Sequence, residues 1–226
     1  MDRVLVWGAS GHAQIVTELL ELSGLYVISG YIDDVNSDRE GQEFEGAVIL
    51  GGRKAVERAA KSGVNCLIVA IGDCVKRKEA CQFGLSVGLR LINAIHPSAV
   101  VSTKASLGVG IVCSAGSVIC PYAIVGDGAI INTSASIDHG CAIGPYAHVA
   151  PGARLAGNVT VGECAWIGIG ATVKDRVNIG SYAVVGAGSV VIRDIPGGCV
   201  AYGVPAKVQR TQDAGRTVNI GRERNG

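Results

Sequence analysis

The sequence predicts a small parallel α/β domain over residues 1–93, then a triangular parallel β-coil over residues 94–207 and a polar tail over residues 208–226. Three observations support this prediction. A strand, a glycine-rich turn and a helix open the chain. An apolar residue then recurs at every sixth position from Ile95 to Val191. Glycine accounts for 33 of the 226 residues and aromatic residues for only 4%, which suits a thin core with many tight corners.

The first domain is predicted from an alternation of strands and helices, which is typical of a parallel sheet covered by helices. Residues 3–7 form an apolar strand, residues 8–12 a turn, and residues 13–22 a helix with one apolar face. A second strand over residues 26–32 ends in two aspartates. The remaining strands are expected over residues 48–50, 64–71 and 89–92, and the remaining helices over residues 53–62 and 76–84.

The turn before the first helix is a candidate phosphate site, because free backbone N–H groups at a helix N-terminus attract anions. It reads Gly-Ala-Ser-Gly-His over residues 8–12, so its Gly-x-x-Gly spacing departs from the dinucleotide pattern Gly-x-Gly-x-x-Gly. Asp33 and Asp34 follow the second strand, where a carboxylate can accept hydrogen bonds from a ribose or a base. A solvated turn explains these two aspartates equally well.

Residues 95–196 repeat with a period of six, which fits neither an α-helix nor a flat strand. Three such hexads close one turn of about eighteen residues, and each hexad supplies a short strand and a corner. An ordinary antiparallel β domain would instead show alternation, with turn signals every eight to twelve residues or so. Glycine often takes the second place, where a Cβ would crowd a corner. The first place is aliphatic apart from one cysteine, and it should point inward together with a small residue at the fifth place: Ile95, Val101, Leu107, Cys113, Ile119, Val125, Ile131, Ile137, Ile143, Val149, Leu155, Val161, Ile167, Val173, Ile179, Val185 and Val191.

Composition excludes several classes of function. The net charge is +1 and no basic stripe is interleaved with aromatic residues, so nucleic acid is not an expected partner. The apolar run over residues 4–7 is too short for a signal peptide, and no segment is long enough for insertion into a membrane. The eight cysteines include no Cys-x-x-Cys pair, so we expect small core residues in a reducing cytoplasm and no metal site.

The coil carries few groups that can do chemistry, and His139 is the first of them. It takes the third place of its hexad, so its imidazole should point outward, either as a general base or as a solvated surface group. Gly157, eighteen residues further on, should stack on the next turn roughly 4.8 Å away. Its N–H can donate to a developing oxyanion, although a corner glycine is an equal explanation. His148 lies half a turn from His139, so a site that uses both histidines would lie between neighbouring subunits.

Several motifs together resemble one family. The chain is similar to sugar O-/N-acyltransferases of the sialic acid O-acetyltransferase type, and among them to bacterial N-acetyltransferases of nucleotide-linked 4-amino-4,6-dideoxy sugars. The resemblance covers nearly the whole chain, and it implies a Rossmann-like domain followed by a left-handed parallel β-helix built from hexapeptide repeats. It is carried by the segments at residues 8–12, 32–34, 70–72, 96–99, 137–144, 148–153, 157–159 and 203–207.

The resemblance also implies roles for individual residues. His139 would deprotonate the sugar amine as it attacks the thioester of acetyl-CoA, and Gly157 would donate its N–H to the thioester oxygen. His148 would lie near the thioester, and Ile169 and Ala187 would contact the pantetheine. Such enzymes are homotrimers that bind acetyl-CoA between adjacent coils and transfer the acetyl group directly. The nucleotide-sugar contacts would be Ser10, Gly11, His12, Asp33, Asp34 and Gly72.

Two residues depart from the family pattern. Gly140 stands where many relatives carry an acidic residue directly after the base, and Ala187 stands where glycine is frequent. The leading hypothesis is a cytoplasmic, acetyl-CoA-dependent N-acetyltransferase for a nucleotide-linked 4-amino-4,6-dideoxy sugar, in surface polysaccharide biosynthesis. The alternatives are O-acetylation of sialic acid or another sugar hydroxyl, and a catalytically inactive nucleotide-binding relative. A dinucleotide-dependent oxidoreductase would rest on the first fifty residues or so alone. The sequence does not distinguish UDP, GDP and dTDP.

Overall fold

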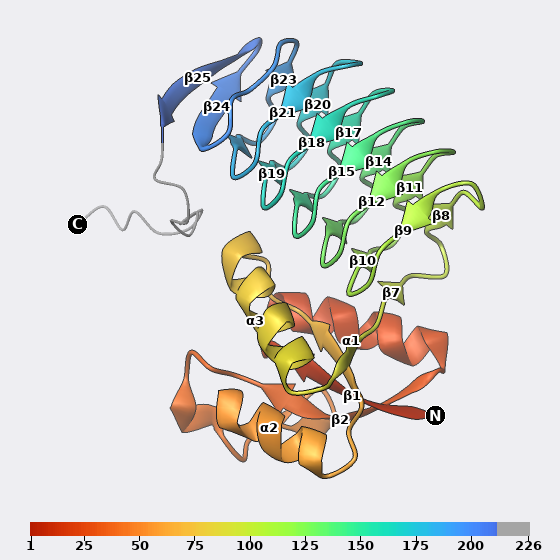
Figure 1. Ribbon diagram of the computed structural model, residues 1–226, viewed down its shortest axis with the longest axis vertical. Coiled ribbons are helices and arrows are strands. Elements are labelled where there is room, and N and C mark those ends of the chain that lie inside the picture. The colour runs from red at the N-terminus through yellow and green to blue at the C-terminus, as the bar shows by residue number, and fades with distance from the viewer. Residues whose placement is uncertain (212–226) are drawn as a thin grey trace.

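Four parallel strands form the sheet of the N-terminal region, in the spatial order β2-β1-β5-β6 (Figure 1). The computed structural model describes residues 1–211. All the strands and helices expected in this region are present, and the short strand expected over residues 48–50 forms one half of a β3–β4 hairpin. The elements are β1 (Asp2–Trp7), α1 (Gly11–Ser23), β2 (Tyr26–Ile32), the short 3-10 helix η1 (Ser37–Arg39), β3 (Glu43–Phe44), β4 (Ala47–Val48), α2 (Arg53–Lys61), β5 (Cys66–Val69), α3 (Cys74–Ser86) and β6 (Arg90–Leu91).

The helices cover both faces of this sheet, and β1 shows the division because its side chains alternate. Val4 and Val6 pack in the same buried layer as the apolar side of α1. Leu5 and Trp7 pack on the opposite face with α2 and α3. In Figure 1, α1 and one end of α3 lie nearest the coil, and α2 lies farthest from it.

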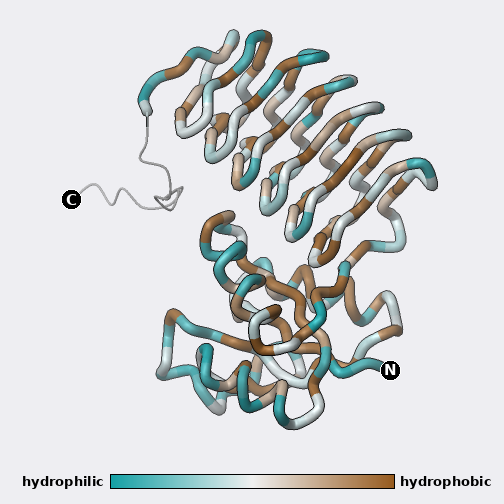
Figure 2. The backbone as a smooth tube through the Cα atoms, viewed as in Figure 1, coloured by the Kyte–Doolittle hydropathy of each residue, from teal (hydrophilic) through white to brown (hydrophobic). Residues whose placement is uncertain are grey.

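The coil is a three-sided prism of two-residue strands. Paired strands are one turn apart, as in the register that joins Cys113 to Ile131 and Ile131 to Val149, so the period of eighteen residues is confirmed. Figure 2 shows the turns stacked into a regular column above the N-terminal region. The connectivity is that of a left-handed β-helix.

Each side of the prism is a stack of parallel strands from successive turns. The first face contains β7 (Ala94–Ile95), β10 (Val112–Cys113), β13 (Ile130–Ile131), β16 (His148–Val149), β19 (Trp166–Ile167) and β22 (Val184–Val185). The second face contains β8 (Val100–Val101), β11 (Val118–Ile119), β14 (Ser136–Ile137), β17 (Arg154–Leu155), β20 (Thr172–Val173) and β23 (Val190–Val191). The third face contains β9 (Ser106–Leu107), β12 (Ile124–Val125), β15 (Ala142–Ile143), β18 (Thr160–Val161) and β21 (Asn178–Ile179).

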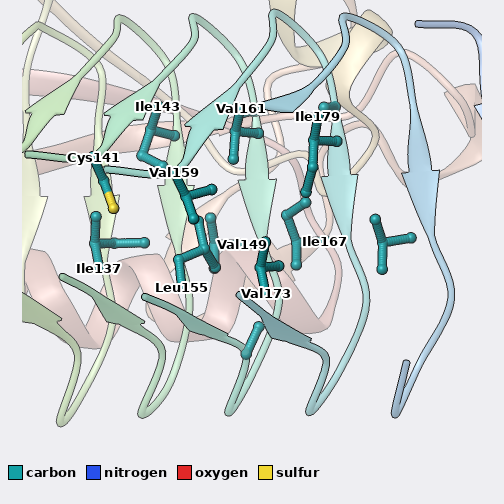
Figure 3. Packing of buried hydrophobic residues seen from close by; sticks show 14 of the residues in the cluster. Ile137, Cys141, Ile143, Val149, Leu155, Val159, Val161, Ile167, Val173 and Ile179 are labelled. Carbon is teal, nitrogen blue, oxygen red and sulfur yellow. The ribbon is translucent and has the colours of Figure 1, made fainter. Parts of the chain in front are cut away.

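The first-place and fifth-place residues of the hexads fill the prism, as expected. Ile137, Leu155 and Val173 form one such aliphatic ladder, and Figure 3 shows it beside the ladders of the other two faces. Residues of the first turn, such as Ile95 and Val101, are only partly buried because no turn of the coil precedes them. This continuous column of apolar contacts holds the turns together.

Glycine occurs at two places of the hexads for two separate structural reasons. At the second place, a Cβ on Gly144 would lie 2.7 Å from the backbone of Gly162 on the next turn, and Gly168 meets its neighbouring turn in the same way. The left-handed backbone conformation occurs instead at the fourth place, where φ is +67° at Gly140 and +61° at Asn158. The second-place glycines are therefore needed for close approach of two turns, and the fourth place makes the corner.

A hairpin closes the far end of the coil, and the sequence did not predict it. Strand β24 (Cys199–Gly203) pairs with β22 in parallel, and β25 (Ala206–Thr211) pairs with β24 in the antiparallel direction. Strand β25 therefore extends beyond residue 208, where the polar tail was expected to begin. The rest of that expected tail, residues 212–226, lies outside the described residues.

Candidate active site

A cavity of about 620 Å³ opens where β1, β2 and β5 end. Four of the residues predicted to contact a nucleotide sugar line it, namely Ser10, Asp33, Asp34 and Gly72. Gly11 is the first residue of α1, next to Ser10 of the lining. The carboxyl ends of parallel strands are where open α/β sheets bind their ligands, so this cavity is the candidate nucleotide site.

Asp33 fixes the loop after β2, which lines this cavity. Its Oδ1 accepts hydrogen bonds from the backbone N–H groups of Val35 and Asn36, both at 3.1 Å, and its Oδ2 accepts one from Nη1 of Arg39 at 2.9 Å. The same Nη1 donates to the carbonyl of Ala9 at 2.7 Å, so the loop after β2 is tied to the glycine-rich turn. Most of the acceptor capacity of Asp33 is used inside the protein.

Asp34 and Lys76 are the more available charges in the cavity. The Asp34 carboxylate has one long contact, 3.8 Å to Nε of Arg53, and that guanidinium is itself 3.7 Å from Glu79. Lys76 lines the cavity, and its ammonium group has no side-chain partner among residues 1–211. An ammonium group in the same cavity as the start of α1 suits a phosphate, and a carboxylate with only one long contact suits a ribose or base.

The rings of His12 and His148 lie close together, with centroids 6.5 Å apart, and His148 is buried whereas His12 is partly buried. Burial, and to a smaller extent the guanidinium of Arg77, lower the pKa of His12 to about 4. Burial also lowers the pKa of His148 well below its usual value, as do the charges of Arg77 and His12. Both imidazoles are therefore neutral at neutral pH, and Nε2 of His12 has no partner among the described residues.

His148 is held by a polar chain that the sequence analysis missed. Its Nδ1 lies 3.3 Å from the carbonyl of Gly72, so a neutral ring carries its proton there. Its Nε2 then accepts from Nδ2 of Asn132 at 3.1 Å, while Oδ1 of Asn132 accepts from the N–H of Thr133 at 2.8 Å. The ring packs 4.1 Å from Trp166 and is only 4% exposed. Asn132 could have been noticed as an amide at a second place often taken by glycine.

His139 lies on the outside of the coil, as its hexad position predicts. A Cβ built on Gly157 would lie 2.7 Å from both Cε1 and Nε2 of His139, so the imidazole rests against this bare Cα. The two turns are also joined by the N–H of Asn158, which donates to the carbonyl of His139 at 2.9 Å. The N–H of Gly157 donates to no acceptor within residues 1–211. An imidazole and a free amide donor therefore lie side by side.

No carboxylate of the described chain orients the His139 ring. Oδ1 of Asp138 accepts from the backbone N–H of His139 at 2.6 Å, and the imidazole itself has no hydrogen-bond partner in this part of the chain. A side chain at Gly140 would collide with Oδ1 of Asn158. The amide of Asn158 thus fills the space that a side chain at position 140 would need.

The coil residues predicted to bind acetyl-CoA lie on two different edges of the prism. His139 and Gly157 follow β14 and β17 at the edge between the second and third faces. Ile169 and Ala187 follow β19 and β22 at the edge between the first and second faces. Ile169 is 61% exposed, and its carbonyl accepts from the N–H of Gly188 on the next turn. One copy of the chain therefore does not bring all four residues together.

Comparison with known proteins supports a common function for these features. The PglD N-terminal domain family matches residues 3–82. No curated protein matches the chain. A variant of perosamine N-acetyltransferase from Caulobacter crescentus, in complex with CoA and GDP-perosamine, is 40% identical with a TM-score of 0.89, and the match covers 93% of this chain and 98% of that one.

Two further solved structures are similar over almost the whole chain. The acetyltransferase domain of PglB from Neisseria gonorrhoeae FA1090, in complex with acetyl coenzyme A, is 34% identical with a TM-score of 0.85, covering 92% of this chain and 98% of that one. WeeI from Acinetobacter baumannii AYE is 25% identical with a TM-score of 0.78, covering 92% and 100%.

The fold, the cavity and these matches define a sugar acetyltransferase. The chain belongs to the hexapeptide-repeat sugar acetyltransferases, the family of perosamine N-acetyltransferase, the PglB acetyltransferase domain and WeeI. The solved relatives bind CoA or acetyl-CoA. Among residues 1–211, no three His, Cys, Asp or Glu side chains gather as a metal-binding group, and none of the helices there has the length and apolar character to cross a membrane.

Proposed function

We propose that this enzyme acetylates the amino group of a nucleotide-linked 4-amino-4,6-dideoxy sugar, with His139 as the general base. The observation that carries the proposal is the imidazole of His139 lying against Gly157, whose amide N–H is free, in a chain that also has a nucleotide-type cavity. The 40% identical relative binds GDP-perosamine, so a GDP-linked amino sugar is the first acceptor to test.

In the proposed reaction, the lone pair of the sugar amine attacks the carbonyl carbon of the acetyl thioester. His139 accepts a proton from the attacking nitrogen, which is a contribution of about 10²- to 10⁴-fold in rate for a positioned base. The carbonyl oxygen becomes an oxyanion, and the N–H of Gly157 stabilises it by about 2.7–4 kcal/mol. The carbon–sulfur bond then breaks, and CoA leaves as a thiolate that takes up a proton.

Different residues of the cavity would bind different parts of the nucleotide. Ser10, Gly11 and Lys76 would bind the diphosphate at the N-terminus of α1. Asp34 would accept from the ribose or the base, while Asp33 keeps the loop in place. His12 and Gly72 would border the path from the phosphates towards the sugar, next to the Asn132–His148 pair.

We further propose that the active enzyme is a homotrimer. Within one chain, His139 and Gly157 lie on a different edge from Ile169 and Ala187, so a site that uses all four must combine edges of two copies. A closed ring of three copies gives each edge a partner. A cytoplasmic location and a role in surface polysaccharide biosynthesis complete the proposal, and the eight unpaired cysteines are in keeping with a reducing compartment.

A panel of acceptors and one substitution test the function. Purified enzyme and acetyl-CoA are assayed with GDP-, UDP- and dTDP-linked 4-amino sugars, with the matching hydroxy sugars, and with sialic acid. We expect acetylation of one of the amino sugars, and a loss of at least 100-fold in kcat for His139→Ala. His96→Ala, a histidine on the first turn of the same coil, is the control. Less than a tenfold loss would remove His139 as the base, and acetylation of hydroxyl acceptors alone would replace N-transfer by O-transfer.

Complementation between two inactive variants tests the shared site. A His139→Ala chain and an Ile169→Glu chain are each expected to have little activity, since each destroys one edge. If a site combines edges of two copies, mixed assembly should restore a fraction of the sites. Recovery of activity on mixing, together with a trimeric mass in solution, is the expected result. A monomer with full activity would rule out the shared site.

A further inference from the structure

Arg77 of α3 is a fully buried cation at the contact between the N-terminal region and the coil. Its Nη1 donates to the carbonyls of Ile71 and Gly72 at 2.8 and 2.7 Å, in the loop after β5. Its Nε donates to the carbonyl of Gly128 at 2.7 Å, and its Nη2 to that of Tyr146 at 2.6 Å, both on the coil. One guanidinium thus binds backbone oxygens of both regions.

No carboxylate of residues 1–211 forms an ion pair with Arg77. A buried charge without an acidic partner is tolerated only if its donors are all hydrogen-bonded, because its hydration has been lost. The remaining short-range contacts of Nη2, to the carbonyl of Ala147 at 3.4 Å and to Sγ of Cys74 at 3.5 Å, complete this shell. Moving either region away from Arg77 would leave a buried charged donor unpaired, so this contact resists displacement.

The carbonyls that Arg77 binds belong to functional elements on the N-terminal side. Ile71 and Gly72 line the candidate nucleotide cavity. The carbonyl of Gly72 also faces Nδ1 of His148 on the first face of the coil. One wall of the cavity is therefore attached to the coil at two points, by Arg77 and by His148, and Arg77 supplies the shorter bonds.

A neighbouring residue of the same helix makes a different kind of contact across the two regions. Nζ of Lys78 lies 2.8 Å from Oε1 of Glu163 on the coil, and both side chains are partly exposed. An exposed ion pair of this kind contributes about 0–1 kcal/mol, and it contacts no wall of the cavity. Lys78 therefore provides a matched comparison for Arg77.

We propose that Arg77 is a positioning residue for acetyl transfer: it fixes the Ile71–Gly72 wall of the nucleotide cavity on the coil, and so determines where a bound nucleotide sugar lies relative to the acyl donor. This inference rests on the proposed function. Arginine suits this role because its planar group presents five donors in fixed directions, whereas a lysine ammonium has three donors at one point and cannot reach carbonyls on both sides.

Substitution of Arg77 tests the inference through binding as well as turnover. For Arg77→Lys we expect at least a tenfold weaker affinity for GDP or UDP by calorimetry, a higher KM for the nucleotide sugar and at least a tenfold lower kcat. Affinity for acetyl-CoA should stay within twofold, because its proposed contacts lie on the coil edges. Lys78→Met, which removes the exposed ion pair, should leave all these constants within twofold.

A second variant leaves Arg77 in place and moves its acceptor. A Cβ on Gly128 would lie 2.7 Å from Cε1 of the Tyr146 ring, so Gly128→Ala should displace the coil-side carbonyls and repeat the Arg77→Lys pattern. This variant decides the question if Arg77→Lys does not fold. Unchanged nucleotide affinity and steady-state constants would overturn the inference, and so would a parallel loss of acetyl-CoA binding. If the wild-type enzyme acetylates none of the nucleotide sugars, the proposed function fails, yet the nucleotide affinities still decide the role of Arg77.

Discussion

The imidazole of His139 rests on the bare Cα of Gly157, one turn further along the coil. Any side chain at position 157 would occupy the space of Cε1 and Nε2, because an ideal Cβ there lies 2.7 Å from both atoms. The glycine therefore does two things at once. It leaves room for the ring, and it leaves an unpaired N–H next to it. This coupling between two residues makes the site sensitive to a single methyl group.

Gly157→Ala should displace the His139 ring and reduce kcat by at least tenfold, while leaving nucleotide affinity unchanged. The reason is steric, since a neighbour at 2.7 Å must move before a Cβ can be accommodated. Steady-state kinetics and calorimetry with GDP or UDP measure the two quantities. Gly152→Ala is the control for activity: its φ of +66° should cost some stability, but a Cβ there meets no atom within 4 Å, so kcat should stay unchanged. Wild-type kcat in Gly157→Ala would contradict the packing seen here.

Asp33 and Asp34 should behave differently although they are adjacent. Asp33→Asn removes the charge that holds Arg39 and the loop after β2, so it should lower the free energy of unfolding by about 1.5–3 kcal/mol and weaken nucleotide binding. Asp34→Asn should weaken nucleotide binding with a change in stability of less than about 0.5 kcal/mol, because its one ion contact is long and partly exposed. Urea denaturation and calorimetry distinguish the two. Equal losses of stability in the two variants would contradict the assignment of Asp33 to the loop and of Asp34 to nucleotide binding.

The period of six was sufficient to predict the coil and the stacking of His139 on Gly157. The place of a residue in its hexad predicts whether its side chain points inward or outward. A separation of eighteen residues identifies the residue that stacks on it in the next turn. The parallel sheet of the first region followed from strand and helix order in the same way. These are local properties of the chain, and their repetition over many hexads makes the prediction of the fold specific.

Contacts between distant segments could not be predicted in this way. Arg77 reads as an ordinary charged helix residue, yet it is buried by turns that lie 51 and 69 residues further along the chain. The role of Asn132 as the hydrogen-bond donor to His148 depends on the fold, which brings the two side chains together. Asp33 and Asp34 are indistinguishable in sequence. Only the fold of the loop that follows them determines which carboxylate accepts hydrogen bonds from that loop. The C-terminal hairpin likewise depends on pairing with β22.

Asn132→Leu should destabilise the protein by about 1–3 kcal/mol, because Nε2 of the buried His148 ring would lose its donor while keeping its burial. The His148 ring would also lose the contact that fixes its orientation, so kcat should fall more than KM for acetyl-CoA rises. Urea denaturation and steady-state kinetics measure these effects. The control for the kinetic effect is Asn93→Leu, which removes an amide that bonds backbone groups of the coil at a distance from His148 and should therefore lower stability without lowering kcat. Unchanged stability of Asn132→Leu would contradict the hydrogen-bond chain described here.

The stability of the enzyme should fall as the pH is lowered from 7.5 to 5.5, because the folded chain holds His12 and His148 as neutral rings. The pKa of His12 is about 4 in the folded chain and about 6.5 when unfolded, and the pKa of His148 is also lowered. The unfolded state therefore binds protons in this range that the folded state does not, and the free energy of unfolding rises with pH. His12 alone should contribute about 1.4 kcal/mol across this interval, a loss that continues down to about pH 4 and then stops. Urea denaturation at several pH values measures the slope, and His12→Asn should reduce it. An identical slope in that variant would mean that His12 already carries its proton in the folded protein, in conflict with its burial beside Arg77.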